Sequence, residues 1–415
     1  MLNQMKKQAA LWCLLFVNIT FGQSAWPSES WTQAVPLTAV MDAGGVQDLS
    51  GLHWNPVTNR LYLVQGSGYL RVLQWNAAGN TFSQLVFKNL PGGPEGITQV
   101  DYSANEFYVI AENAFEIRKY TTSANLSSVT LAKHWNLLNA PSPMTDTGNT
   151  GPEGIVFVPD AALAAAGFVS QQTGSPYTSV KGMGGLVFIA HQDGGYIWVF
   201  DINPGVNNDF AYVGKYKSSQ AESCDLSFDR TTGLLYILHN ISGNNRLEVS
   251  DLSSTIVNGE RKLTDTNEYF IPNTPGSNDN VEGFALTPKC PNSGTVSAWL
   301  CRDTENSDSN AVQQDALRWF NPFTSPGDCL PLGTLSPEVS SFEIAPNPVG
   351  DNLSISFPDE NLRKLEIINI LGQTVLYKLL TARHTDADVS ALPNGVYTTQ
   401  VISEGEISRR KFVKK

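Results

Sequence analysis

Five stretches of the chain repeat one order of polar and apolar positions. Each opens with a polar pair, runs into a short apolar segment, passes a turn and enters a second apolar segment. The stretches begin at Leu49-Ser50-Gly51-Leu52, Pro94-Glu95-Gly96-Ile97, Pro152-Glu153-Gly154-Ile155, Ser223-Cys224-Asp225-Leu226 and Val281-Glu282-Gly283-Phe284. The second segments are Leu61–Val64, Phe107–Ile110, Leu186–Ile189, Leu235–Leu238 and Val296–Leu300. Short apolar runs bounded by turn residues predict strands, so each stretch is expected to form a small antiparallel sheet.

Sheet-forming repeats of this length are typical of a β-propeller. One such sheet cannot bury both of its faces alone, whereas blades packed around an axis cover each other. Ala34–Val40 precedes the first repeat and is predicted to complete the last blade and close the ring. We therefore expect an all-β fold with five blades, and six is the alternative because the repeats are irregularly spaced. Asp160–Met183 is predicted to be an insertion in the third blade, with a short helix at Ala161–Gly167.

Residues 342–415 carry a different pattern. Leu353–Phe357, Leu365–Ile370 and Val396–Val401 alternate apolar and polar positions, and turn sequences separate them. Strict alternation predicts strands that are buried on one face. The pattern indicates a small Ig-like β-sandwich.

Four motifs in this tail resemble the C-terminal sorting domain of the type IX secretion system of Bacteroidetes. They are Pro346-Asn347-Pro348, Leu371-Gly372-Gln373, Leu392-Pro393-Asn394-Gly395-Val396-Tyr397 and Arg410-Lys411-Phe412-Val413-Lys414. Ala345 departs from the family, which often has an aromatic residue there. The resemblance implies sorting-motif roles for Pro346, Asn347, Pro348, Gly372, Gly395 and Tyr397. It also implies that the partner is the secretion machinery; a generic Ig-like binding module is the alternative.

The first residues predict a signal peptide. Lys6 and Lys7 precede a mostly apolar run, Ala9–Phe21, which is too short for a typical membrane span. Cleavage is expected before Gln23. The predicted layout is a signal peptide at 1–22, a propeller at 23–333, a linker at 334–341 and a sorting domain at 342–415. The mature protein is then expected to be secreted or held at the outer-membrane surface after passing through the periplasm, with no transmembrane span.

Charge and cysteine content narrow the function classes. The formal net charge is −12, which argues against nucleic acid as a partner. Four cysteines follow the predicted signal peptide: Cys224, Cys290, Cys301 and Cys329. An even number in an exported chain permits two disulfides, and free buried thiols are the alternative. Cys290 and Cys301 flank a short apolar run, so a local bridge between them is expected.

The repeats resemble the SdiA-regulated family of exported propellers and, more distantly, esterase-like phytase propellers. The matching residues include Ser50-Gly51-Leu52, the two Pro-Glu-Gly-Ile sequences, the run from Asp225 to Tyr236, and Val281-Glu282-Gly283-Phe284-Ala285-Leu286. The resemblance covers about residues 48–320. It implies the fold and the position of the site more than an activity.

Chemistry is expected where the first strands begin, because these ends surround the axis of a propeller. The repeat places Ser50, Glu95, Glu153, Cys224 and Glu282 at equivalent positions, with Asp225 beside Cys224. The ends of the second strands add Gln65, Glu112, His191, His239 and Arg302, with Asp303 beside Arg302. Clustered carboxylates raise one another's pKa unless a cation compensates, and Ca²⁺ prefers oxygen ligands. Glu95, Glu153 and Glu282 are therefore a candidate calcium site. His191 and His239, expected to be exposed, and Glu112 are candidates for acid–base catalysis.

Three function classes follow. The first is a surface or secreted propeller that binds a small molecule or a glycan, with a divalent cation in its channel. The second is a metal-assisted lactonase or esterase. A phytase fits less well, because a phosphate substrate needs several cationic side chains and Arg302 is the only one among the predicted channel residues. The third is a structural or adhesive protein whose channel is only filled.

Overall fold

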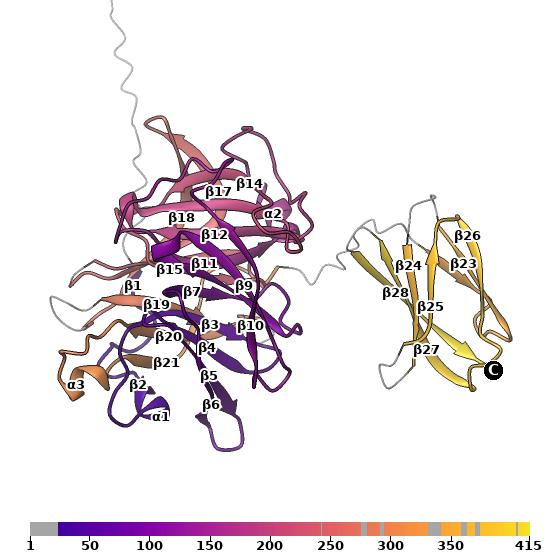
Figure 1. Cartoon of the computed structure of the whole chain (residues 1–415), viewed down its shortest axis with the longest axis horizontal. Coiled ribbons are helices and arrows are strands. Elements are labelled where there is room, and N and C mark those ends of the chain that lie inside the picture. The colour runs from indigo at the N-terminus through magenta and orange to yellow at the C-terminus, as the bar shows by residue number, and fades with distance from the viewer. Residues whose placement is uncertain are drawn as a thin grey trace, which may run out of the picture.

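The computed structural model describes residues 24–241, 243–274, 280–290, 294–330, 342–357, 363–369, 374–403 and 406–415. Strands dominate these residues, as Figure 1 shows, so the predicted all-β class is confirmed. The predicted signal peptide and linker lie outside the described residues. None of the described helices has the length and apolarity that crossing a bilayer requires.

The strands before residue 330 form five four-stranded antiparallel units, numbered here in chain order. Unit 1 contains β3 (Leu49–Asn55), β4 (Arg60–Gln65), β5 (Tyr69–Asn76) and β6 (Thr81–Asn89). Unit 2 contains β7 (Pro94–Thr98), β8 (Glu106–Ala111), β9 (Glu116–Thr122) and β10 (Val129–Asn136). Unit 3 contains β11 (Pro152–Pro159), β12 (Gly185–His191), β13 (Tyr196–Ile202) and β14 (Phe210–Lys217).

Units 4 and 5 follow the same order. Unit 4 contains β15 (Asp225–Asp229), β16 (Leu234–His239), β17 (Arg246–Val257) and β18 (Glu260–Phe270). Unit 5 contains β19 (Val281–Leu286), β20 (Thr295–Arg302), β21 (Leu317–Thr324) and the early strand β2 (Val35–Pro36). Units 3 and 4 also join into one larger sheet through a single β14–β18 pair, Lys217 with Lys262. The strands predicted from the repeat are thus present, and units 3 and 4 share one sheet.

The first strands of the units form a closed inner ring. β3 contacts β7, β7 contacts β11, β11 contacts β15, β15 contacts β19, and β19 returns to β3. Five hydrophobic clusters lie between consecutive units, and each takes its residues from two of them. On β4, for example, Leu61 and Leu63 face unit 5 while Tyr62 and Val64 face unit 2. The near-continuous apolar runs of the sequence therefore exist because both faces of each unit are buried.

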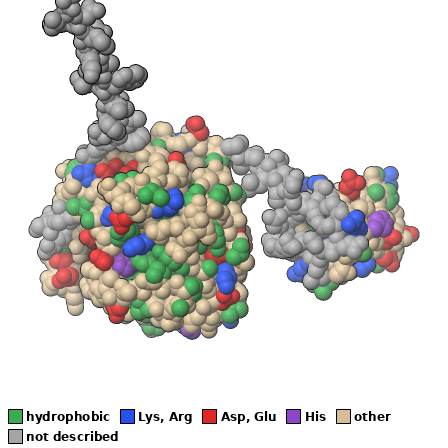
Figure 2. All heavy atoms as spheres, turned by 90° about the horizontal axis from the view of Figure 1, so that it is seen from above, with side chains coloured by type: hydrophobic (Ala, Val, Ile, Leu, Met, Phe, Trp, Pro, Cys, Tyr) green, Lys and Arg blue, Asp and Glu red, His purple; other side chains and the backbone are tan. Residues whose placement is uncertain are grey.

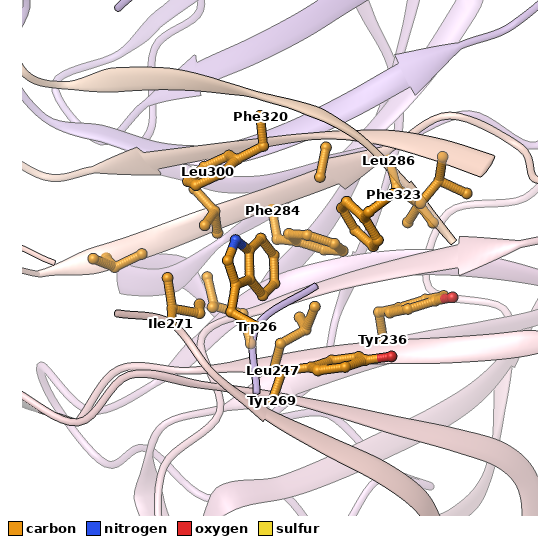
Figure 3. Close-up of a cluster of buried hydrophobic side chains, with 14 of the residues drawn as sticks. Trp26, Tyr236, Leu247, Tyr269, Ile271, Phe284, Leu286, Leu300, Phe320 and Phe323 are labelled. Atoms are coloured by element: carbon orange, nitrogen blue, oxygen red, sulfur yellow. The ribbon is translucent and has the colours of Figure 1, made fainter. Parts of the chain in front are cut away.

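The N-terminal segment fastens unit 5 to its neighbours. β1 (Ser24–Ala25) pairs with β18, and β2 pairs with β21. Between these strands, the Trp26 ring lies 5.3 Å from Phe320 and 6.1 Å from Tyr269, at the centre of the cluster in Figure 3. Only part of the predicted closing strand is extended, because Thr38–Met41 forms the short helix α1. Leu37 and Met41, four residues apart, both pack into the cluster between units 5 and 1.

The predicted insertion lies between β11 and β12, where α2 (Asp160–Ala166) confirms the expected helix. The helix ends at Gly167, which adopts a φ of 61°. A left-handed residue after the last turn is a common helix terminator that favours glycine. Leu163 is fully buried in the cluster between units 3 and 4, so the insertion extends that interface. The remaining helix, α3 (Asn310–Gln313), precedes β21.

The tail forms two sheets of its own. One contains β22 (Glu343–Ala345), β23 (Asn352–Ser356) and β26 (His384–Asp388). The other contains β24 (Arg363–Ile368), β25 (Thr374–Leu380), β27 (Gly395–Ser403) and β28 (Glu406–Lys414). Residues from both sheets, including Ile355, Leu365 and Phe412, share one core, so the predicted alternation is confirmed. Gly372 of the second motif lies outside the described residues.

The disulfide partner predicted for Cys290 from the sequence was wrong. Cys290 bonds to Cys329, and not to Cys301. Cys301 lies within β20, where its side chain is fully buried between units 5 and 1 and approaches the carbonyl oxygens of Leu49 and Ser50. Cys290 lies in the turn after β19, beside the segment that follows β21. Cys224 and Cys301 are free and buried.

Candidate functional site

Both rings of predicted site residues lie at one end of the inner ring. Strand pairing places Leu49 opposite Gln65, Pro152 opposite His191 and Val281 opposite Arg302, so first strands begin where second strands end. Glu95, Glu153 and Glu282 interact through space, and we call these three residues the acidic cup. Glu95 and Glu282 keep part of their surface open to water, whereas Glu153 is 7% exposed.

The carboxyl groups of the acidic cup hold their protons more tightly than free glutamate does. Burial raises the pKa of Glu95 to about 7; a hydrogen bond with Ser50 opposes this rise, and the charge of Glu112 adds to it. Burial raises the pKa of Glu153 and of Glu282 well above the ordinary value, and the other carboxylates raise both further. Nearby, burial raises the pKa of Asp303 to about 6. The cup is therefore partly protonated near neutral pH.

The acidic cup was also predicted to bind calcium. Within the described ranges, which include all three glutamates, no group of three or more His, Cys, Asp and Glu side chains is spaced to hold a metal ion. The carboxylates thus influence one another electrostatically without forming a ready ligand set. Calcium binding there stays a prediction.

The residues at the ends of the second strands point into the blades. Gln65 donates from Nε2 to the Gln47 carbonyl oxygen at 2.6 Å and accepts from Arg71 Nε at 2.8 Å. Arg302 is 5% exposed and lies 3.7 Å from Asp315. Glu112 is 7% exposed and accepts from the Gly151 backbone N–H at 3.1 Å. Glu112 lies close enough for its charge to raise the pKa of all three glutamates of the acidic cup, whereas Gln65 and Arg302 bond to other residues.

The expected exposure of the two histidines is wrong. His191 is 3% exposed and packs against Phe115 and Trp198, and burial lowers its pKa to about 4. His239 is fully buried, with Nδ1 2.6 Å from the Glu222 carbonyl oxygen and Nε2 2.9 Å from Glu248 Oε2. The end of β12, which carries His191, and the end of β16, which carries His239, are both covered by neighbouring residues. The catalytic roles proposed for these residues stay predictions.

Below the acidic cup, the inner strands approach one another closely. A Cβ atom added to Gly96 would lie 2.6 Å from the Glu153 carbonyl oxygen, and one added to Gly154 would lie 2.6 Å from the Asp225 Cα atom. Separations this short exclude any side chain. Gly51 and Gly283 meet neighbouring strands in the same way. The glycines of the first, second, third and fifth repeats therefore allow the inner strands to approach this closely.

Asp225 occupies the glycine position of the fourth repeat, and its side chain fills the space at the centre. Its Oδ1 accepts from the Leu226 N–H at 2.8 Å, while Oδ2 accepts from the Phe284 N–H at 2.8 Å and the Leu52 N–H at 3.4 Å. These three donors belong to β15, β19 and β3, so one buried carboxylate ties three inner strands together. Burial raises the pKa of Asp225 well above its ordinary value, although the three bonds oppose the rise. The Asp225 side chain is thus buried and bonded to three inner strands, whereas the sequence pattern predicted that it would line a ligand channel.

A pocket of about 520 Å³ lies at the opposite end of the inner ring, where the first strands finish. Its lining includes Trp54 from β3, Thr98 from β7, Phe157 from β11, Asp229 from β15 and Leu286 from β19. Every inner strand therefore contributes. The pocket volume falls within the range of small-molecule sites. The sequence prediction placed the site at the other end of these strands and gave His53, which lines the pocket, no role.

The wall formed by units 1 and 5 is aromatic. Trp54 stacks on Trp299 with ring centres 4.8 Å apart, and Trp75 meets Trp319 edge to face at 5.2 Å. Phe82 contacts all four of these rings. Trp75 and Trp319 remain partly exposed, and we call Trp54, Trp75, Phe82, Trp299 and Trp319 the aromatic wall. Trp54 lies on a first strand, Trp299 on a second strand, and Trp75 and Trp319 on third strands, so no shared repeat position marks the aromatic wall in the sequence.

The opposite side of the pocket carries one cation. Arg230 extends from unit 4 past unit 3 and donates to the carbonyl oxygens of Gln99 at 2.6 Å and Val100 at 2.9 Å, which follow β7 of unit 2. The guanidinium lies 4.0 Å above the Tyr102 ring centre and 5.3 Å from that of Phe157. His53 lies near it, and burial together with the Arg230 charge lowers the pKa of His53 to about 3. Neutral His53 leaves Nε2 without a partner.

This arrangement suits recognition more than proton transfer. Flat apolar rings on one side, a fixed cation on the other and small polar side chains between them can orient a ligand with a ring and a polar substituent. The small uncharged polar residues of the lining are Asn59, Thr98, Ser227, Thr231, Thr287 and Ser297. The acidic groups and the pocket occupy opposite ends of the inner ring, with the close glycine contacts between them. Figure 2 shows one face of the molecule, on which charged and apolar side chains lie among other side chains and backbone.

The whole chain can be compared with curated proteins and with solved structures. No curated protein matches the chain. A solved structure, described as PorZ, an essential bacterial surface component of the type-IX secretion system of Porphyromonas gingivalis, is 12% identical with a TM-score of 0.29. That alignment covers 89% of this chain and 59% of the other, and a TM-score this low carries no argument about this chain.

The match within the tail is specific and agrees with the four motifs. Residues 343–415 match the family described as the secretion system C-terminal sorting domain. Pro346, Asn347 and Pro348 precede β23, and Gly395 and Tyr397 lie in β27. The Tyr397 hydroxyl donates to the Pro393 carbonyl oxygen at 2.8 Å, which connects the third motif to its own turn. Residues 343–415 are therefore a type IX secretion sorting domain, which indicates export of the chain to the cell surface or beyond it.

Proposed function

We propose that the protein is an exported five-bladed β-propeller that binds a small organic ligand or a glycan at the cell surface or in the medium. Support for the blade number comes from the five strand units, the closed contacts of their first strands and the five clusters between them. The tail is best interpreted as an Ig-like sandwich that serves sorting. The SdiA-regulated resemblance agrees with an exported propeller of this kind.

The observation that carries the binding function is the pocket at the finishing ends of the inner strands. It combines a volume of about 520 Å³ with five aromatic rings of the wall and one arginine. Rings that remain partly exposed at the entrance, Trp75 and Trp319, can offer their faces to a ligand without a large rearrangement. Stacking on such rings contributes substantially to binding because large apolar faces leave water.

Binding can be tested with a glycan and small-molecule screen followed by titration calorimetry. We expect Trp75→Ala and Trp319→Ala to weaken binding of any hit, because both rings border the pocket. Phe87→Ala is the matched control, since Phe87 is an exposed aromatic residue of β6 outside the pocket. Equal loss in all three variants, or in none of them, would contradict a binding site at this pocket.

A divalent cation at Glu95, Glu153 and Glu282 is a separate proposal, and the metal-assisted hydrolase depends on it. Burial and the charges of neighbouring carboxylates raise the pKa of the three carboxyl groups, and a bound cation would oppose both effects. Calcium titration of the protein, with Glu95→Gln and Glu153→Gln combined as the control, tests it. Heat of binding that persists in the double variant would place calcium elsewhere. The structural or adhesive alternative predicts no ligand at either end.

A further inference from the structure

We propose that the pocket selects a sugar ring that bears a carboxylate, such as a hexuronic acid residue of a glycan, with the carboxylate on Arg230 and the ring on the aromatic wall. This inference rests on the proposed binding function and names its ligand class. The inference is based on one pocket that is lined both by Arg230, which has no ion pair, and by the stacked indole rings of the aromatic wall.

Arg230 has no ion-pair partner among the residues that the structure describes. Burial lowers its pKa, and Asp101 opposes this only through space. The neighbouring carboxylate of Asp229 is already engaged, because Oδ1 accepts from the Thr231 N–H and hydroxyl, and Oδ2 accepts from the Lys289 N–H. A partly buried guanidinium without an ion pair is costly, so an anionic ligand that binds it directly would relieve that cost.

The guanidinium is also fixed in place. A guanidinium carries five N–H groups, and the bonds to the Gln99 and Val100 carbonyl oxygens engage one terminal nitrogen each. Stacking on Tyr102 holds its plane. The remaining N–H groups can serve a planar carboxylate, which arginine binds with two parallel hydrogen bonds. Little side-chain entropy would be lost on binding, because the protein has already ordered the group.

The rest of the lining favours a sugar over other anions. Arg230 is the only cationic side chain among the lining residues, whereas a phosphate group usually recruits several donors and charges. A ligand cation would be repelled by the same arginine. Asn59, Ser227, Thr231 and Ser297 supply donors and acceptors for hydroxyl groups. The aromatic wall then covers the apolar face of the ring.

The test compares matched ligands by titration calorimetry on the whole protein. The probes are a galacturonic acid disaccharide, its methyl ester, the neutral galactose disaccharide and benzoate. We expect the free acid to bind about ten- to a hundredfold more tightly than its ester, the range typical of hydrogen bonds to a charged group. Arg230→Gln should reduce acid binding to the level of the ester and leave ester binding unchanged. Retained ester binding also shows that the variant is folded.

The outcomes separate this inference from the proposed function. Equal binding of acid, ester and neutral sugar, lost in Trp75→Ala and unaffected by Arg230→Gln, would overturn the carboxylate assignment and leave the binding pocket standing. Benzoate binding as tight as that of the sugar acid would overturn the assignment to a sugar. No binding of any of the four probes would overturn the inference, while the wider ligand screen with Trp75→Ala and Phe87→Ala would still decide the proposed function.

Discussion

Glu95→Gln is expected to change how the stability of the region that contains the five strand units depends on pH. Burial raises the pKa of Glu95 to about 7 from an ordinary value of 4.5, and neighbouring carboxylates contribute. The folded protein therefore binds this proton more tightly than the unfolded chain does. Its contribution to stability is present at low pH and is lost as the pH rises from about 4.5 to about 7. Gln cannot ionise, and its amide oxygen can still accept the hydrogen bond from Ser50.

The size of the effect follows from the two pKa values. A difference of one pKa unit corresponds to about 1.4 kcal/mol, so ionising Glu95 in the folded state costs about 3 kcal/mol. We expect Glu95→Gln to match the native protein at pH 4 and to exceed its free energy of unfolding by about 3 kcal/mol at pH 8. Removing this charge also relieves Glu153 and Glu282, which it repels.

Urea unfolding followed by tryptophan fluorescence measures this difference. The tail from residue 342 onward contains no tryptophan, so the signal reports the propeller and not the sorting domain. This matters because two domains need not unfold in one step. Glu343→Gln, an exposed glutamate of the tail, is the control and should leave the fluorescence transition unchanged at both pH values.

Parallel pH profiles of the native protein and Glu95→Gln would refute the reasoning, since they would mean that Glu95 ionises without cost. Calcium provides a second arm of the experiment. If the acidic cup binds a cation, calcium at pH 8 should stabilise the native protein more than Glu95→Gln. Equal stabilisation of both would count against the predicted site.

Three further changes test the packing of the ring, each by urea unfolding with the same fluorescence signal. Asp225→Ala leaves three buried backbone N–H groups without an acceptor, at about 1–3 kcal/mol each, so a loss of about 3 kcal/mol or more is expected; an unchanged midpoint would contradict its central role. Gly96→Ala inserts a Cβ 2.6 Å from a neighbouring carbonyl oxygen and should cost about 1–3 kcal/mol, whereas Gly205→Ala, the control, should cost little. Cys290→Ser removes the bond to Cys329 and should cost about 2–4 kcal/mol, and a reducing agent should then have no further effect on the variant.

Much of the fold could be predicted from local patterns. The strands of the repeats, the insertion with its helix and the alternation in the tail each depend on residues close together in the chain, so the sequence alone locates them. The equivalent positions of Glu95, Glu153 and Glu282 were predicted in the same way, and the charges of the three carboxyl groups interact through space. A repeat places equivalent residues at the same level of a ring, whatever they do there.

Burial and partner choice could not be predicted in this way. His239 occupies a position equivalent to other strand ends, but neighbouring strands cover it completely. Asp225 replaces a glycine in the repeat, and only the assembled ring shows that its carboxylate meets N–H groups from β3 and β19. The pocket was missed because Trp54 and Trp299 come from units 1 and 5, which are far apart in sequence and adjacent only after the ring closes.

The sequence by itself determined the strand pattern, the repeat and the sorting tail, because spacing of apolar residues and turn motifs act over a few positions. The tertiary structure decided which cysteines bond, which polar side chains are buried, and which end of the inner ring holds a pocket. These features depend on side chains that meet across neighbouring strand units, between residues that lie far apart in the chain. Packing of that kind is a property of the closed ring, and no local pattern contains it.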